Sequence, residues 1–258
     1  MTLAADPAPR AWTMRETSYR PRAPLDLHET VGILRRGPKD PTVVRDGSVI
    51  WLALRTTAGI ATLALRPASG EVHASAWGPG ADAALDLLPA LCGALDDPDG
   101  FDPSAHPLIA ATARRNPGLR LTRTGAVFDA LSGVILEQKV TGLQAYGAWR
   151  LLVTRFGDPA PGPVPRPMTV APDAEGWRRI PSWAWHRAGV QPPQSRALVR
   201  AAAPLDEDED RGEEPLRRPQ EDDPQHRRGG RREDEPEDAR DTGEERHDGT
   251  KEQRCDLR

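Results

Sequence analysis

The chain has 258 residues, of which 37% are hydrophobic, and its formal net charge is −4. That hydrophobic fraction is low for a fully folded chain of this length, so we expect part of the chain to lie outside any core. The two cysteines, Cys92 and Cys255, form no Cys-x-x-Cys pair, and no Cys/His cluster offers ligands for zinc or an iron–sulfur cluster. We therefore expect no cofactor. No apolar run approaches the length of a membrane span, so we expect no membrane segment and a cytoplasmic location.

The composition changes abruptly near residue 204. Residues 204–258 contain no aromatic residue and carry 12 Lys and Arg against 21 Asp and Glu, a net charge of −9. Residues 1–203 carry a net charge of +5. A segment so charged and so poor in apolar residues cannot bury enough surface to fold alone, so we expect 204–258 to be a disordered, highly charged tail. The mildly basic remainder permits a polyanionic partner.

Residues 1–100 are predicted to form an antiparallel β-sheet with a covering helix. After a loosely ordered start with Trp12 or Tyr19 as an edge-strand anchor, a short helix is expected to begin near Asp26. An Asp46-Gly47 corner between two apolar runs is a strong hairpin signal, and two more turn signals follow it. The expected strands are 42–45, 48–55, 60–66 and 71–77. Residues 81–95 have apolar residues at helical spacing, with Cys92 as a buried core thiol, and Pro89 should kink or split that helix.

Residues 101–203 are predicted to be helical. The expected helices are 107–116, two within 124–156, short ones in 168–180 and 181–189, and 192–203, with an extended Pro-rich connection at 157–167. Ser182 is a candidate N-cap for the helix in 181–189. The fold class that follows is α+β, an antiparallel sheet domain over 1–100 followed by an all-α domain over 101–203.

The stretch 124–156 is interpreted as two helices that meet at a tight polar corner, Glu137-Gln138-Lys139. A corner of this kind can present side chains to a ligand while both helices bury their apolar stripes. The alternative is a plain helix pair whose corner has no function. The apolar positions that define the two stripes are Val127, Leu131, Val134, Ile135, Leu143, Tyr146, Leu151 and Val153.

Several short runs carry a resemblance to a known family. They include Phe101-Asp-Pro-x-x-His-Pro-Leu108, Gly118-Leu-Arg120, Val134-Ile-Leu-Glu-Gln-Lys-Val-Thr-Gly142, Ala148-Trp-Arg150, Phe156-Gly-Asp-Pro-Ala-Pro-Gly162 and Trp183-x-Trp185-His-Arg-Ala-Gly189. Together they resemble the bacterial 3-methyladenine DNA glycosylase II family, part of the helix-hairpin-helix DNA glycosylase superfamily. The resemblance covers roughly residues 20–203, and the Ile-Leu-x-Gln-x-Val core at 135–140 is its most specific part.

The resemblance implies a base-excision-repair enzyme that removes alkylated purines such as 3-methyladenine from double-stranded DNA. It further implies a monomer that needs no cofactor and is associated with the nucleoid. The target nucleotide is flipped into a pocket between the domains, and a side chain fills the gap in the duplex. By this resemblance Gln138, Lys139 and Thr141 contact DNA, with Gln138 and Lys139 at the gap-filling positions. Because a Lys head group is costly to desolvate, a phosphate contact is the alternative for Lys139.

The base pocket of the family is aromatic, which suits a cationic alkylated base through cation–π attraction. The resemblance implies that role for Tyr146, Trp149, Trp183 and Trp185. The alternative for each is an ordinary aromatic residue of the core.

Two features that the family has after these helices are absent from the sequence beyond residue 203. One is a helix-hairpin-helix with a Leu-Pro-Gly-Ile-Gly type of turn, whose N–H groups hold a DNA phosphate. The other is the Asp that follows it, which stabilises the positive charge on the sugar as the base leaves. We therefore assign no catalytic residue and expect the chain as it stands to be inactive. The alternatives are a non-catalytic DNA- or protein-binding module and a non-functional truncated product.

We interpret the abrupt change at residue 204 as a shift of reading frame, because Arg, Pro, Gly, Asp and Glu are what GC-rich DNA tends to encode off-frame. The alternative is a genuine acidic tail that masks a basic face. Without closing helices, helices 107–116, 124–156 and 192–203 should expose apolar stripes, which predicts marginal stability.

The gene sequence tests the frame interpretation. We expect that shifting the frame near codon 203 restores an apolar helix followed by a Leu-Pro-Gly-x-Gly turn. Nucleotide sequencing across codons 200–210 and translation of the other two frames checks this. If neither frame encodes those features, the acidic tail is the better interpretation.

Overall fold

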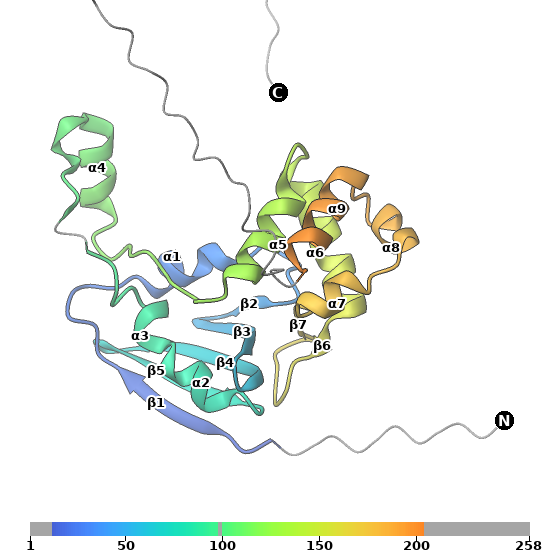
Figure 1. Cartoon of the computed structure of the whole chain (residues 1–258). Coiled ribbons are helices and arrows are strands. Elements are labelled where there is room, and N and C mark those ends of the chain that lie inside the picture. The colour runs from blue at the N-terminus through green and yellow to red at the C-terminus, as the bar shows by residue number, and fades with distance from the viewer. Residues whose placement is uncertain (1–11, 98–99, 204–258) are drawn as a thin grey trace, which may run out of the picture. The chain divides into compact units, whose positions relative to one another are not determined.

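The structure is a computed structural model that describes residues 12–97 and 100–203 (Figure 1). The expected disordered tail at 204–258, and with it the frame interpretation, lie outside the described residues. The elements confirm the α+β class: an antiparallel sheet comes first in the chain, and a group of helices follows. None of the helices in the described ranges is both long and apolar enough to span a bilayer.

The sheet has five antiparallel strands in the order β1-β5-β4-β3-β2. Its strands are β1 (Arg15–Tyr19), β2 (Val43–Asp46), β3 (Val49–Thr56), β4 (Gly59–Ala68) and β5 (Glu71–Trp77). Asp46 pairs with Val49, so the hairpin loop is Gly47-Ser48, one residue later than predicted. The reason is that Gly47 takes a φ of +58°, which suits the first central position of a type II′ turn. Tyr19 lies in β1, at the edge of the sheet as expected.

Three short helices cover one face of the sheet: α1 (Leu27–Val31), α2 (Ala81–Asp86) and α3 (Leu88–Leu91). Asp26 caps α1, because its carboxylate accepts a hydrogen bond of 3.0 Å from the backbone N–H of Glu29. Pro89 lies in the first turn of α3, so the predicted split of 81–95 is confirmed. Cys92 is buried among these residues, and burial raises the pKa of its thiol to about 12, as expected for an unreactive core thiol.

The helical part forms a second core. Its helices are α4 (Pro107–Arg115), α5 (Val127–Glu137), α6 (Gly142–Phe156), α7 (Ala174–Arg178), α8 (Ser182–Arg187) and α9 (Pro192–Ala201). The short 3₁₀ turn η3 (Pro103–Ala105) precedes α4, whereas η1 (Gly32–Leu34) follows α1 in the sheet part. The indole rings of Trp149, Trp177 and Trp185 stack in sequence, with centroids 6.0 and 5.8 Å apart. Ser182 is the first helical residue of α8 and not its N-cap, so that prediction is wrong. The cap position belongs to Pro181, which has no side-chain acceptor.

The Pro-rich connection brings the helical part onto the other face of the sheet. Its strands β6 (Asp158–Pro159) and β7 (Thr169–Val170) pair with each other. Met168 and Val170 pack against Val44 and Ala53 of the sheet. The N–H of Thr169 also donates to the carbonyl of Pro41, 2.9 Å away. The two parts of the chain are therefore joined through side-chain packing and backbone hydrogen bonds.

The expectation of uncovered apolar residues holds for α4 and for part of α5, and fails for α9. No residue of α4 is buried, and Leu108 is 63% exposed. Leu198 of α9 is fully buried, because α9 packs on α5. The expectation that both corner helices bury their whole apolar stripes is also wrong, since exposed positions include Val127, Leu131, Val134 and Leu143. The residues that α5 buries are Ser132, Gly133, Ile135 and Leu136, of which only Ile135 belongs to the predicted stripe.

A fully buried carboxylate, that of Asp40, joins the sheet to the helices. Its Oδ1 accepts hydrogen bonds from the N–H and the hydroxyl of Thr42, both 2.8 Å, and from Trp149 Nε1 at 3.2 Å. Its Oδ2 accepts the backbone N–H of Arg36 at 2.6 Å. One side chain thus fixes the loop before β2 and an indole of α6 at the same time.

We expect Asp40→Ala to lower the free energy of unfolding by about 3 kcal/mol, because it leaves buried donors on Thr42 and Trp149 without an acceptor. Urea denaturation followed by tryptophan fluorescence measures the change. The matched control is Asp86→Ala, which removes an exposed carboxylate from α2 and should change stability by less than about 0.5 kcal/mol. Equal losses in the two variants would contradict the assigned role of Asp40.

Candidate functional site

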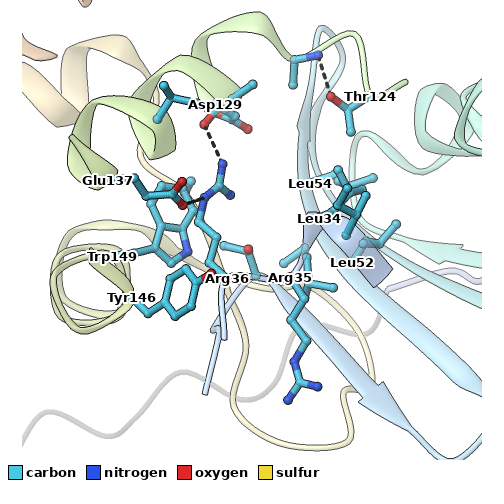
Figure 2. A pocket seen from close by; sticks show the side chains of 18 residues that line it. Leu34, Arg35, Arg36, Leu52, Leu54, Thr124, Asp129, Glu137, Tyr146 and Trp149 are labelled. Carbon is cyan, nitrogen blue, oxygen red and sulfur yellow. Dashed lines mark hydrogen bonds and ion pairs between the residues drawn. The ribbon is translucent and has the colours of Figure 1, made fainter. Parts of the chain in front are cut away.

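A pocket of about 310 Å³ lies where α5 and α6 face the sheet (Figure 2). Residues 33–36 form one wall, and β2 and β3 form the next, with Leu52 and Leu54 among the contributing side chains. The remaining wall consists of α5 and α6, which contribute Asp129, Glu137 and Trp149. The pocket therefore combines an apolar floor with a small group of charged and aromatic side chains, as binding sites for small groups commonly do.

The Arg36 side chain reaches between the loop and α5 inside this pocket. Its Cζ lies 4.3 Å from the centroid of the Trp149 ring, a cation–π arrangement. Its Nη2 donates to the carbonyl of Asp129 at 3.5 Å, and its Nε lies 3.9 Å from Oε1 of Glu137 (Figure 2). The side chain is only 22% exposed. A cation of the protein itself is thus held on the aromatic face of the pocket.

The sequence of α5 makes room for this cation. Asp129, Gly133 and Glu137 follow one another at intervals of four and so share one face of the helix. A Cβ at Gly133 would overlap the guanidinium of Arg36. A glycine inside a helix costs roughly 0.5–1 kcal/mol relative to alanine. We infer that this cost is tolerated here because only glycine leaves space for the guanidinium.

Asp129 is a carboxyl group whose ionisation is disfavoured by its position. Burial raises its pKa, while the nearby charges of Arg55 and Arg36 lower it and only partly offset burial. Asp129 therefore retains its proton to a higher pH than a solvated Asp does. Arg55 itself is fixed, because it donates to the carboxylate of Asp158 at 2.6 Å and to the carbonyl of Ala171 at 3.0 Å.

Two of the four aromatic residues expected in a base pocket line this one. Trp149 is 2% exposed and lies beneath Arg36. Tyr146 packs against Gly37, whose φ is +79°, and a Cβ there would come within 2.8 Å of Cδ2 of the tyrosine ring. Tyr146 and Trp149, both in α6, therefore line the same pocket.

The other two aromatic residues, Trp183 and Trp185, do not line this pocket. Trp185 is buried in the helical core, where its Nε1 donates to the carbonyl of Ile180 at 3.1 Å. Trp183 is 50% exposed, and the guanidinium of Arg155 lies 4.8 Å from its ring centroid. Two residues apart on a helix, the two side chains point in nearly opposite directions, so they cannot share one wall. The structure therefore brings Tyr146 and Trp149 together in this pocket and places Trp183 and Trp185 away from it.

The corner between α5 and α6 is exposed and tightly bent. Gln138 ends α5, and Lys139 follows with a φ of +57°, the one non-glycine residue with positive φ in the described ranges. Thr141 is the N-cap of α6, since its hydroxyl accepts the N–H of Gln144 at 3.4 Å. The side chains of Gln138, Lys139 and Thr141 are all exposed. A left-handed conformation at a Lys is uncommon and marks a corner that its surroundings fix.

Gln194 of α9 fixes this corner. Its buried side-chain amide donates to the carbonyls of Ile135, Leu136 and Gln138 at 3.4, 3.2 and 2.9 Å. These carbonyls lie at the C-terminal end of α5, where the helix leaves acceptors unpaired, although that of Ile135 also accepts the backbone N–H of Gln138 at 3.3 Å. Sequence reasoning missed Gln194, and it also missed the roles of Arg36, Asp40 and Asp129. The one signal for the pocket was Gly133, because an isolated glycine inside a helix commonly has a packing reason.

Comparisons with known proteins fit this geometry. No protein-family model matches the chain, and no curated protein sequence matches it either. Solved structures do match. A 3-methyladenine DNA glycosylase from Archaeoglobus fulgidus is 15% identical, with a TM-score of 0.61, over 74% of this chain and 67% of that one. MBOgg1 in complex with a low-affinity DNA ligand is 14% identical, with a TM-score of 0.53, over 74% and 64%.

An 8-oxoguanine glycosylase/lyase from Clostridium acetobutylicum, in complex with duplex DNA, is 10% identical, with a TM-score of 0.54, over 74% and 63%. The chain therefore shares the fold of these DNA glycosylases. The solved structures that match in fold include both a 3-methyladenine glycosylase and an 8-oxoguanine glycosylase. The chain spans about two thirds of the length of these proteins.

We expect Gln194→Leu to loosen the corner, because the carbonyls of Leu136 and Gln138 lose the donor that Gln194 supplies, with a cost of about 1–2 kcal/mol. Hydrogen exchange measured by mass spectrometry should show faster exchange in peptides covering 138–141, with exchange in β3 and β4 unchanged. Ser195→Ala on the same helix is the control. If exchange at the corner stays as slow in Gln194→Leu as in the control, Gln194 does not hold it.

Proposed function

We propose that this chain binds double-stranded DNA at a damaged purine, everts that base into the pocket between the sheet and α5/α6, and does not cleave the glycosidic bond. The observation that carries this proposal is the continuity of pocket and corner in a DNA glycosylase fold. Glu137 is a wall residue of the pocket, and Gln138 and Lys139 follow it directly on an exposed bend. A base and the side chain that replaces it in the duplex must be close together, so this adjacency meets the main geometric requirement of base flipping.

The charge of the helical part supports a DNA partner. Residues 101–203 contain 13 Lys and Arg against 6 Asp and Glu, whereas residues 1–100 have fewer bases than acids. Exposed cations include Lys139 at the corner, Arg150 on α6, and Arg196 and Arg200 on α9. Cationic side chains of this kind attract the phosphate backbone and release its counterions, which gives salt-dependent affinity.

The corner residues receive separate roles in this proposal. Gln138 fills the space left by the everted base, since its amide can replace hydrogen bonds of the lost base. Lys139 contacts a phosphate, because its charged head group is too costly to insert into the base stack. Thr141 lies at the N-terminus of α6, where unpaired N–H groups favour a phosphate oxygen.

The proposed lack of cleavage follows from the sequence. The resemblance assigns base removal, on alkylated purines such as 3-methyladenine, to an Asp after a Leu-Pro-Gly-x-Gly turn, and no such turn occurs in 204–258. Of the pocket carboxyl groups, Glu137 lies 3.9 Å from Arg36, and burial raises the pKa of Asp129 and so disfavours its charged form. Neither is a free carboxylate held opposite an open site, which a glycosylase needs for charge stabilisation at the sugar.

Fluorescence anisotropy with labelled duplexes tests the proposal. We expect a duplex carrying a tetrahydrofuran abasic analogue to bind about tenfold more tightly than the undamaged duplex, since no stacked base must be displaced. Affinity for both duplexes should fall as salt rises. Lys139→Ala should weaken binding to both, while Lys39→Ala removes the same charge from another exposed position and should have a smaller effect.

Equal affinity for the two duplexes would overturn the proposed base eversion. Cleavage is measured separately, by alkali treatment of duplexes that carry alkylated purines after incubation with the protein. Strand breaks at the lesion above the level of a protein-free sample would overturn the proposal that the chain does not cleave.

A further inference from the structure

We infer that Arg36 determines the class of base that the pocket accepts, by excluding cationic alkylated bases and favouring a neutral purine with carbonyl and ring-nitrogen acceptors on its edge. This inference rests on the proposed function, because it concerns the base that enters the same pocket. It reverses the expectation that an aromatic pocket selects a cationic base.

The first argument is that the aromatic face is already occupied. Arg36 lies 4.3 Å from the centroid of the Trp149 ring, and only 2% of Trp149 remains exposed. A base that enters the pocket therefore meets the guanidinium and not the indole face. A cationic base would gain no cation–π contact with Trp149 and would approach a like charge in a partly buried site, where repulsion is screened less than in water.

The second argument concerns the other charges around Arg36. From α5 it faces Asp129 and Glu137, and from the loop and β3 the nearest cations are Arg35 and Arg55. Glu137 is 44% exposed and 3.9 Å away, so its compensation is partly screened by solvent. Burial disfavours the charged form of Asp129. The positive charge of Arg36 is thus incompletely neutralised, and the pocket favours an electron-rich edge.

The third argument is the hydrogen-bonding geometry of the guanidinium. It carries five N–H donors in a planar fork, and its contacts with the Asp129 carbonyl and the Glu137 carboxylate are long, at 3.5 and 3.9 Å. A purine that offers a carbonyl at C6 and an unsubstituted N7 matches two adjacent donors, which is the pairing that arginine makes with guanine edges. Alkylation at N7 removes one acceptor and adds a positive charge.

The fourth argument is that the position of Arg36 is built into the fold. Its backbone N–H is held by the buried carboxylate of Asp40 at 2.6 Å. Gly133 supplies the space for its guanidinium, which any larger residue would fill. With its backbone held by Asp40 and its guanidinium accommodated beside Gly133 and against the Trp149 ring, the Arg36 side chain forms part of the pocket wall.

Competition binding with duplexes that differ in one base tests the inference. The neutral probe contains deoxyinosine, which keeps both acceptors, and the cationic probe contains 7-methyldeoxyguanosine stabilised by a 2′-fluoro group. The full chain should bind the neutral probe about tenfold more tightly than the cationic one. Arg36→Met, which keeps the apolar stem and removes the charge, should bring that ratio to near one or reverse it.

Two further variants test the inference without relying on Arg36→Met alone. Gly133→Ala keeps the charge but displaces the guanidinium from the Trp149 ring, so the ratio should fall even if Arg36→Met does not fold. Arg45→Met removes an exposed cation from β2 and should leave the ratio unchanged. A preference for the cationic probe, or a ratio that persists in both Arg36→Met and Gly133→Ala, would overturn the inference.

The tetrahydrofuran duplex separates this failure from failure of the proposed function. If the unmodified chain prefers that duplex over undamaged DNA but discriminates between the two bases in the wrong direction, only the role of Arg36 is wrong. If it shows no preference for the tetrahydrofuran duplex, base eversion itself is wrong and the inference fails with it.

Discussion

The buried carboxylate of Asp40 accepts four hydrogen bonds, three from the loop that leads into the sheet and one from the indole of Trp149, 109 residues further along the chain. A buried charge is costly unless its oxygens are satisfied, and the loop supplies three of the donors that satisfy this one. The fourth donor, the indole of Trp149, is itself buried and would be unpaired without Asp40. This directional bond links the loop before β2 to α6, in addition to the apolar contacts between the two parts.

The pocket is a consequence of that link. Because Asp40 holds both the backbone of Arg36 and the ring of Trp149, the guanidinium and the indole are brought together without a direct link in sequence. The face of α5 that carries Gly133 then closes over the guanidinium. The guanidinium of Arg36 on the aromatic wall is thus part of the fold, as the strands are. The chemistry of the pocket follows from its position.

The helical part holds a precisely defined local site beside helices whose apolar residues are exposed. α4 has no buried residue, and part of α5 presents apolar side chains to solvent, while the chain spans about two thirds of the DNA glycosylases it resembles in fold. The corner at Lys139 is nevertheless fixed, because Gln194 satisfies the carbonyls at the end of α5 from within the described chain. The pocket and the corner thus both lie within the described residues, and our proposal of binding without base release starts from them.

The sequence by itself determined the elements. Gly47 and Gly70 take positive φ angles that few other residues adopt, so they mark turns between strands. Pro89 cannot donate a helical hydrogen bond, so it marks the split helix. Strands, turns and the split helix therefore followed from local chemistry. Periodicity also located the helix pair of 124–156 and its polar corner. It misjudged which face of α5 is buried, because that depends on whether a partner covers it.

Only the tertiary structure decided the site. The contact of Arg36 with Trp149 spans more than a hundred residues. Trp149 and Trp185 both belong to the helical core, and no local pattern shows that only Trp149 also lines the pocket. Spacing along a helix fixes the direction in which a side chain points, but it does not determine which part of the protein lies in that direction. The elements of this chain are set by interactions between near neighbours in sequence, and its pocket by long-range packing around a buried charge.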